Sequence, residues 1–143
     1  MANFLFTSFR NGVLGSHTTY VDLDADTVGI MFVDHADDTP VVGDDFLNDI
    51  ASAARVPALA SVPALASKTI GTAGAGVGVF DAADTTFTAL TGDASESLIM
   101  FKNTGTDTTC NMIAFWDTAT GLPLTPNGGD VTIAWSSSGI FSF

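Results

Sequence analysis

The chain has little of the material from which disulfide frameworks and metal centres are built. Its 143 residues include one cysteine, Cys110, and two histidines, His17 and His35. A single cysteine excludes an intramolecular disulfide and a Cys-rich metal site, and we expect a buried, inert thiol at Cys110. Neither histidine has a second His or Cys at ligand spacing, so both are expected in loops.

Long apolar runs are also missing. No stretch approaches the roughly 18 apolar residues that cross a bilayer, and residues 1–14 lack the apolar core and cleavage site of a signal peptide. These features predict a protein that is made in a cytoplasm and has no membrane partner.

Positive charge is scarce. Four Lys and Arg stand against fifteen Asp and one Glu, which gives a formal net charge of −12. Nucleic acids and anionic membranes both require clustered Lys and Arg, so the composition argues against either partner. The preference for Asp over Glu suits strands and turns, because Asp bonds to nearby backbone in turns whereas Glu favours helices.

Catalytic motifs do not emerge from the sequence. A Gly-x-Ser-x-Gly elbow is absent, although composition alone leaves a Ser-His-Asp triad open. The glycines of 74–78 lack the spacing and the β-α-β context of a dinucleotide loop. Fifteen aspartates form close pairs by chance, so paired acids carry no argument for glycoside hydrolysis. We therefore predict that the protein is not an enzyme and needs no cofactor.

Alternating acids at Asp22, Asp24 and Asp26 begin as a Ca²⁺ loop does. An EF-hand then needs Gly at its sixth position and Glu at its twelfth, where this chain has Thr27 and Val33. A solvated acidic turn is the prediction. Looser Ca²⁺ binding at a subunit boundary stays open as an alternative, with three further aspartates as contributors, Asp34, Asp37 and Asp38.

Five short apolar runs in the second half of the chain alternate with turn residues. They are rich in β-branched and aromatic side chains and cover 77–80, 85–89, 97–101, 112–116 and 131–135. Such spacing is typical of an all-β fold. Since the length suits one domain, residues 1–143 are predicted to form one mainly β domain, an antiparallel sandwich or barrel-like fold.

The N-terminal half is expected to add one or two short helices. Residues 1–15 would hold the first, capped by Asn3, covering Phe4–Leu14 and stopped by Gly15. One face of this helix would carry Phe6, Phe9 and Val13, with Leu5 as a further candidate, and would pack onto a sheet.

Further elements are expected between this helix and the Pro-rich middle of the chain. Residues 18–23 and 28–33 have strand-like patterns, with 22–26 also suited to an acidic turn. A second short helix is predicted over 44–54, with Asp44 as its cap.

A tandem hexapeptide, Val-Pro-Ala-Leu-Ala-Ser, occupies 56–61 and 62–67. Each Pro favours extended backbone, so we expect 56–78 to be an extended Pro/Gly-rich segment. The favoured interpretation is an edge strand of its own domain; an arm on a neighbouring subunit is the alternative. Residues 71–78, with four glycines, are expected to be a flexible connection.

Most of the chain resembles a family of small structural proteins of tailed-phage virions, of the head decoration or cement type. The likeness lies in GVFDAADTTFTAL (78–90), IMFKNTGTD (99–107), IAFWDTATGLPLTPNGGDVTIAW (113–135) and the closing Gly139–Phe141. The aromatic N-terminal helix, the acidic turn and the 28–33 strand also fit the pattern. The tandem hexapeptide is not part of it.

The resemblance implies a protein that binds the assembled lattice of the major capsid protein. It would be a homo-oligomer, with a trimer favoured, made in the host cytoplasm and located on the capsid surface of the virion. The interface candidates are apolar residues at the two ends and in the middle segment, Phe4, Phe6, Phe9, Val56, Leu59, Val62, Leu65, Ile140, Phe141 and Phe143. The other role open to these residues is closure of the domain's own core.

Two rival functions stay open. A head-tail connector or tail component would occupy a unique vertex, so its copy number would be small. A glycan or host-surface binding module would expose aromatic side chains, with Tyr20, Trp116 and Trp135 as candidates.

Overall fold

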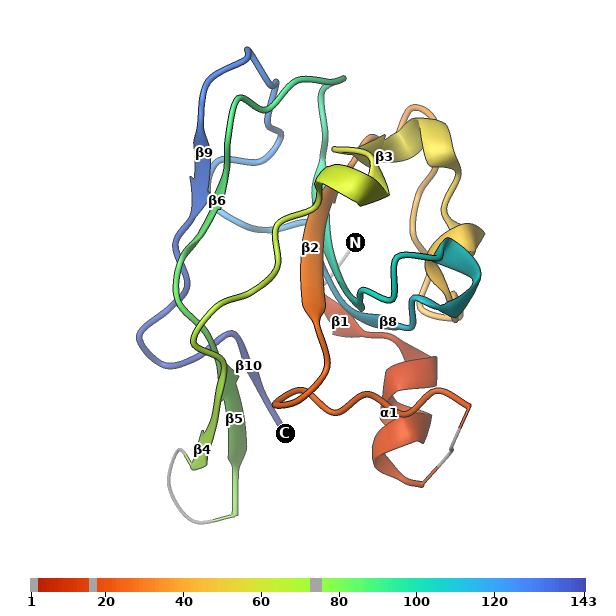
Figure 1. Cartoon of the computed structure of the whole chain (residues 1–143), viewed down its shortest axis with the longest axis vertical. Coiled ribbons are helices and arrows are strands. Elements are labelled where there is room, and N and C mark those ends of the chain that lie inside the picture. Colours follow the sequence, from red (N-terminus) through yellow and green to blue (C-terminus); the bar gives the residue numbers. More distant parts are fainter. Residues whose placement is uncertain (1–2, 16–17, 73–75) are drawn as a thin grey trace.

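The computed structural model describes residues 3–15, 18–72 and 76–143 (Figure 1). It is mainly β, with antiparallel sheets of five, three and two strands. The predicted fold class, a small sandwich-like β domain, is confirmed.

The five-stranded sheet forms the middle of the molecule. Its spatial order is β1-β8-β7-β2-β3, and every neighbouring pair is antiparallel. The strands are β1 (Phe4–Leu5), β2 (Val28–Val33), β3 (Arg55–Val56), β7 (Ser97–Lys102) and β8 (Met112–Trp116). Strands β2 and β7 pair over their full length, with Ile30 opposite Met100.

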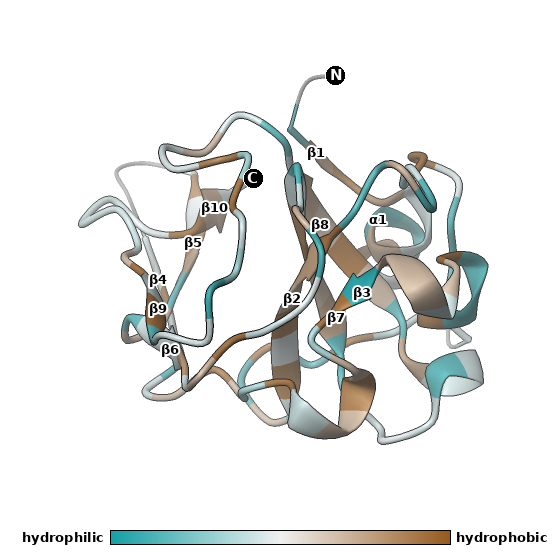
Figure 2. Cartoon of the chain, turned by 90° about the horizontal axis from the view of Figure 1, so that it is seen from above, coloured by the Kyte–Doolittle hydropathy of each residue, from teal (hydrophilic) through white to brown (hydrophobic). Residues whose placement is uncertain are grey.

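A second layer covers one face of this sheet (Figure 2). It consists of a three-stranded sheet of order β10-β5-β4 and a two-stranded ribbon of β6 and β9. The strands are β4 (Thr69–Thr72), β5 (Gly78–Asp81), β6 (Thr85–Phe87), β9 (Val131–Ile133) and β10 (Phe141–Ser142).

Helical segments cover the opposite face (Figure 2). They include helix α1 (Thr7–Val13) and the 3-10 turns η1 (Leu47–Asp49), η2 (Ser52–Ala54) and η4 (Asp107–Thr109), while η3 (Leu59–Ser61) lies in the hexapeptide segment. The central sheet is therefore buried on both faces. One core contains Ile30 and Met100, and the other contains Met31 and Ile99, so neighbouring residues of β2 and of β7 enter opposite cores.

Two-sided burial explains the continuous apolar runs. A strand with one solvated face alternates apolar and polar residues, whereas β2 is buried at all of its six positions. All five strands predicted in the second half are present, as β5, β6, β7, β8 and β9.

The predicted helix over Phe4–Leu14 is wrong at its start. Phe4 and Leu5 form β1, which pairs with β8, and the Phe4 ring stacks on Phe115 at 4.6 Å. Asn3 does not cap a helix. Its Oδ1 instead accepts hydrogen bonds from the backbone N–H groups of Asp117 and Thr118, because strand pairing, rather than helical propensity, governs this end.

Two further N-terminal predictions are also wrong. Residues 18–23 form no strand, and the acidic turn at 22–26 is the feature that is present. The helix over 44–54 is replaced by η1 and η2, since Asp49 Oδ2 accepts the N–H groups of Asp45 and Phe46 and tightens the chain into a 3-10 turn. Asp44 caps nothing there; it accepts the N–H of Val41.

The hexapeptide segment lies against its own domain's sheet, but only Val56 belongs to an edge strand, and residues 59–61 form the 3-10 turn η3 rather than extended backbone. β3 is an edge strand on β2, and Leu65 N–H donates to Val28 O at 2.8 Å. Gly29 permits the close approach, since a Cβ there would lie 2.8 Å from Val62 Cγ1. The connection predicted over 71–78 overlaps two strands, because β4 extends to Thr72 and β5 begins at Gly78; residues 73–75 lie outside the described residues.

Candidate functional site

An apolar groove lies where the end of α1 meets the last residues of the chain. Leu5, Val13, Leu14 and Phe143 line it beside Arg10, and its volume is about 220 Å³. Leu14 is 86% exposed, Phe143 58% and Val13 49%. Exposed apolar side chains that gather at one place mark a contact surface, whereas single ones are ordinary.

Aromatic contacts hold the two sides of the groove together. The Phe9 ring meets Phe141 edge-on at 5.9 Å and Phe143 at 6.1 Å between centroids. Phe141 lies in β10, opposite Phe80 of β5. After α1 the chain turns at Gly15, whose φ of 110° favours glycine. Both walls of the groove are thus anchored in the folded domain.

Arg10 is the cation at the edge of the groove. Its Nη2 donates to Thr7 Oγ1 at 3.5 Å, and none of the ion pairs found among the described residues includes it. The other three cations bond to acceptors inside the fold, in the pairs Arg55–Asp107, Lys102–Asp26 and Lys68–Asp26.

The interface candidates named from the sequence divide by burial. Phe6, Phe9, Val56 and Leu65 are buried in the chain's own core. Partly buried against that core are Phe4, Leu59, Val62, Ile140 and Phe141. Phe143 alone among them is mainly exposed. It is therefore the one predicted interface residue that lines the groove with its side chain open to solvent.

Sequence reasoning missed Arg10 and Leu14 and placed Val13 on the buried face of the helix. That placement is wrong, because α1 is only seven residues long and Val13, at its last position, is half exposed. The sequence did contain a signal for this exposed surface, the apolar pair Val13-Leu14 directly before Gly15. These residues lie at the end of a short helix, where neighbouring segments need not cover them.

The acidic turn at 22–26 is closed by its own side chains. Asp22 Oδ1 accepts the N–H groups of Asp24 and Ala25, and Asp26 Oδ2 accepts the N–H of Asp22. Burial alone would raise the pKa of Asp26, but the hydrogen bonds from Lys102 and the Asp22 backbone, with the lysine charges, outweigh it and hold the pKa below its ordinary value. These carboxylates act as turn-forming groups.

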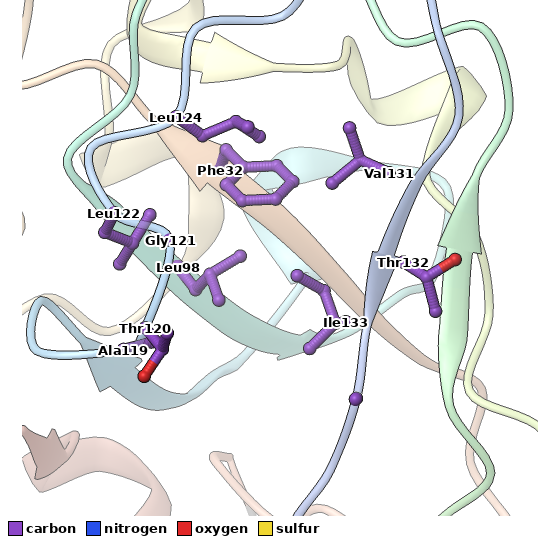
Figure 3. Close-up of a pocket in the computed structure, with 11 residues that line it drawn as sticks. Phe32, Leu98, Ala119, Thr120, Gly121, Leu122, Leu124, Val131, Thr132 and Ile133 are labelled. Carbon is purple, nitrogen blue, oxygen red and sulfur yellow. The ribbon is translucent and has the colours of Figure 1, made fainter.

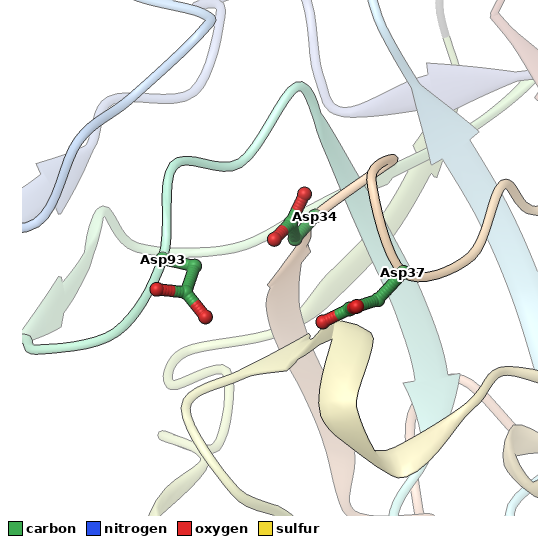
Figure 4. Close-up of side chains that lie close together, drawn as sticks. All are labelled: Asp34, Asp37 and Asp93. Atoms are coloured by element: carbon green, nitrogen blue, oxygen red, sulfur yellow. The ribbon is translucent and has the colours of Figure 1, made fainter.

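A different set of carboxylates meets at the loops after β2 and before β7 (Figure 4). One oxygen from each of Asp34, Asp37 and Asp93 lies within 4.8 Å of the others. Asp34 is buried and accepts the Ala36 N–H at 2.7 Å. Oxygen sets of this kind suit Ca²⁺ or Mg²⁺. Asp38, the third contributor named from the sequence, instead accepts the Ala51 N–H at 2.6 Å.

The structure brings His35 and Ser97 together, with Nε2 and Oγ 2.8 Å apart. A serine beside an imidazole is the start of a nucleophilic triad. Here Ser97 is fully buried, and the carboxylate of Glu96 accepts the backbone N–H of His35 rather than orienting its ring. The pair therefore ties two strand ends together and offers no accessible nucleophile. His17 lies outside the described residues.

A cavity of about 460 Å³ lies between the central sheet and β9 (Figure 3). Apolar side chains from both layers and from the loop after β8 form its walls, Phe32, Leu98, Leu122, Leu124, Val131 and Ile133. None of the residues that line it is charged. The cavity offers apolar surface but no acid, base or metal ligand.

The aromatic residues named for glycan binding do not form one platform. Trp116 and Trp135 are half-buried, pack against the core and lie 6.0 Å apart between ring centroids. Tyr20 is exposed. Tyr20 is thus more exposed than either tryptophan.

No protein-family model matches the chain, and a search of curated proteins found no relative. None of the helices in the described part of the chain is long and apolar enough to cross a bilayer.

Proposed function

We propose that the chain is a structural protein of a tailed-phage particle, bound to the assembled lattice of the major capsid protein as a decoration or cement protein. The observation that carries the proposal is the apolar groove at α1 and Phe143, a contact surface on an otherwise acidic domain. The sequence resemblance of most of the chain supports the same function.

The design of the domain suits this role. A central sheet buried on both faces gives a rigid body, and capsid binding requires contact surfaces rather than reacting groups. The His35–Ser97 pair, whose serine is buried, and the uncharged cavity offer no reaction centre. The chain would form homo-oligomers, with a trimer favoured, and many of these oligomers would bind one capsid lattice. Their weak contacts with the capsid, repeated over the lattice, would together keep the protein on the particle.

Copy number per particle tests the proposal against a connector or tail component. Quantitative mass spectrometry of purified particles would compare this chain with the major capsid protein. A ratio between roughly one-third and one supports lattice decoration by repeated contacts. A small ring at one vertex would give a far lower ratio, and absence from particles would refute a virion role.

A further inference from the structure

We propose that the groove lined by Leu5, Val13, Leu14 and Phe143 receives an apolar side chain of a different protein, and that Arg10 pairs with a carboxylate beside that side chain. The inference rests on the proposed function, since it names the chemistry that the groove selects in the capsid partner. It is the chemistry of a short segment in which an apolar residue and an acidic residue are neighbours.

The apolar half of the argument is the shape and lining of the groove. Leu14 stands almost entirely in water at the end of α1, with Val13 beside it and Phe143 across from it. The groove is open, so a side chain can enter from outside and remove apolar surface of both proteins from water. The Phe9 contacts that fix Phe143 to α1 keep the two walls in place before a partner arrives.

The charged half of the argument is Arg10. Three of the four cations are held by acceptors within the fold, whereas Arg10 bonds only to the Thr7 hydroxyl among the described residues. With a net charge of −12, most of the surface repels an acidic partner. Arg10 is the point where a carboxylate meets a cation, and a guanidinium can bind a carboxylate through two parallel hydrogen bonds.

A second copy does not fit the groove in a two-fold dimer. In such a dimer the same surface meets itself, so two Arg10 side chains would face each other. The side chains that line the groove include no carboxylate to separate them. The groove is therefore not complementary to itself across a two-fold axis, and a head-to-tail contact with a second copy is the competing outcome that the test below detects.

The test uses the full chain and capsids of the phage that encodes it, assembled without this protein. Binding of the labelled chain is measured by co-sedimentation. Leu14→Asp and Arg10→Glu are each expected to weaken binding at least tenfold. Ile70→Asp is the matched control, because Ile70 is a 61% exposed apolar residue of β4 away from the groove, and it should bind like the wild type.

The salt dependence of capsid binding separately tests the proposed pairing of Arg10 with a carboxylate of the partner. Binding of the wild type should weaken as salt is added, and Arg10→Gln should show a shallower dependence. The three substituted positions, Leu14, Arg10 and Ile70, are exposed, and unchanged thermal melting of each variant establishes that loss of binding is not loss of folding.

The outcomes separate the groove from the proposed function. If the wild type and the groove variants bind capsids equally, the groove proposal is wrong while capsid binding stands. If the wild type does not bind capsids, both are wrong. If ultracentrifugation shows a wild-type oligomer that Leu14→Asp dissociates, the groove holds a second copy and the proposal of a different partner is overturned.

Discussion

Lys102 Nζ lies 2.9 Å from Asp26 Oδ2, so the last residue of β7 holds the acidic turn that precedes β2. The two side chains are only 26% and 24% exposed. A partly buried, hydrogen-bonded pair contributes more to stability than an exposed one, and a contribution of about 1 kcal/mol is expected.

Replacing Lys102 with Met should therefore lower the free energy of unfolding by about 1 kcal/mol at neutral pH. The substitution keeps the apolar stem and removes the charge. Arg10→Met is the matched control, because Arg10 has no ion pair among the described residues, and it should leave stability nearly unchanged. Urea denaturation of the three proteins measures the difference; equal losses in both variants would contradict the assignment.

The same pair predicts a pH dependence. The pKa of Asp26 is lowered in the folded protein, so its contribution to stability is present above the ordinary value of 3.8 and is lost as pH falls through the folded-state pKa. The stability difference between wild type and Lys102→Met should shrink as acid is added. A difference that stays constant from pH 7 into that acid range would show that the cost of Lys102→Met is packing alone.

The pKa of Asp44 is shifted in the opposite direction from that of Asp26. Burial, with the charges of Asp49, Asp38 and Asp45, raises its pKa despite the hydrogen bond from Val41. The folded state therefore binds this proton more tightly than the unfolded state, and stability falls as pH rises through the interval above 3.8.

Asp44→Asn keeps an oxygen that can accept the Val41 N–H and removes the charge. It should raise stability at pH 7 by a few tenths of a kcal/mol, about the size of a partly screened charge interaction, with no gain in strong acid. Asp24→Asn, an exposed change of equal charge, is the control and should have little effect. A gain that persists unchanged in strong acid would refute the electrostatic cause.

Gly29→Ala should destabilise the domain by about 1–3 kcal/mol, the usual cost of overpacking. The new Cβ would lie 2.8 Å from Val62 Cγ1, and the short, stiff valine cannot move far. Gly71→Ala, in β4, meets no atom within 4 Å and serves as the control. The double variant Gly29→Ala with Val62→Ala should recover part of the loss; purely additive costs would mean that the two sites do not touch.

The carboxylates of Asp34, Asp37 and Asp93 lie close enough to repel one another, so removing one charge should stabilise the protein. Asp93 is exposed, so Asp93→Asn should raise the melting temperature slightly by removing like-charge repulsion. Millimolar Ca²⁺ should shift the melting of the wild type no more than an equal concentration of Mg²⁺ does. A Ca²⁺-specific rise in melting that Asp93→Asn abolishes would instead identify a cation site.

The strands of the second half could be predicted because their composition and spacing are local properties. The run Met112–Trp116 matches β8 at both ends, since β-branched and aromatic residues lie between turn residues. The N-terminal region could not be predicted so well. The local spacing around Phe4 favours an aromatic helix, but Phe4 pairs with Phe115, more than one hundred residues away. Local spacing carries no information about so distant a partner.

The groove also could not be predicted from local sequence patterns. Val13 has helical spacing relative to Phe6 and Phe9, which favours a core position. Whether a position on a helix is covered depends on where other segments end, and here Phe143 arrives beside α1 only through β10. In the same way, the closeness of Asp93 to Asp34 and Asp37 arises from two loops that meet in space.

The central sheet ends in two very short strands, since β1 and β3 each contain two residues. Such strands offer too few free backbone groups to template a neighbouring chain. Crowded copies of this domain are thereby protected against merging through the two edges of the central sheet. An ordered array in which copies met at these edges would be built from side-chain contacts, which can be made and broken without disturbing the strand pairing of the sheet.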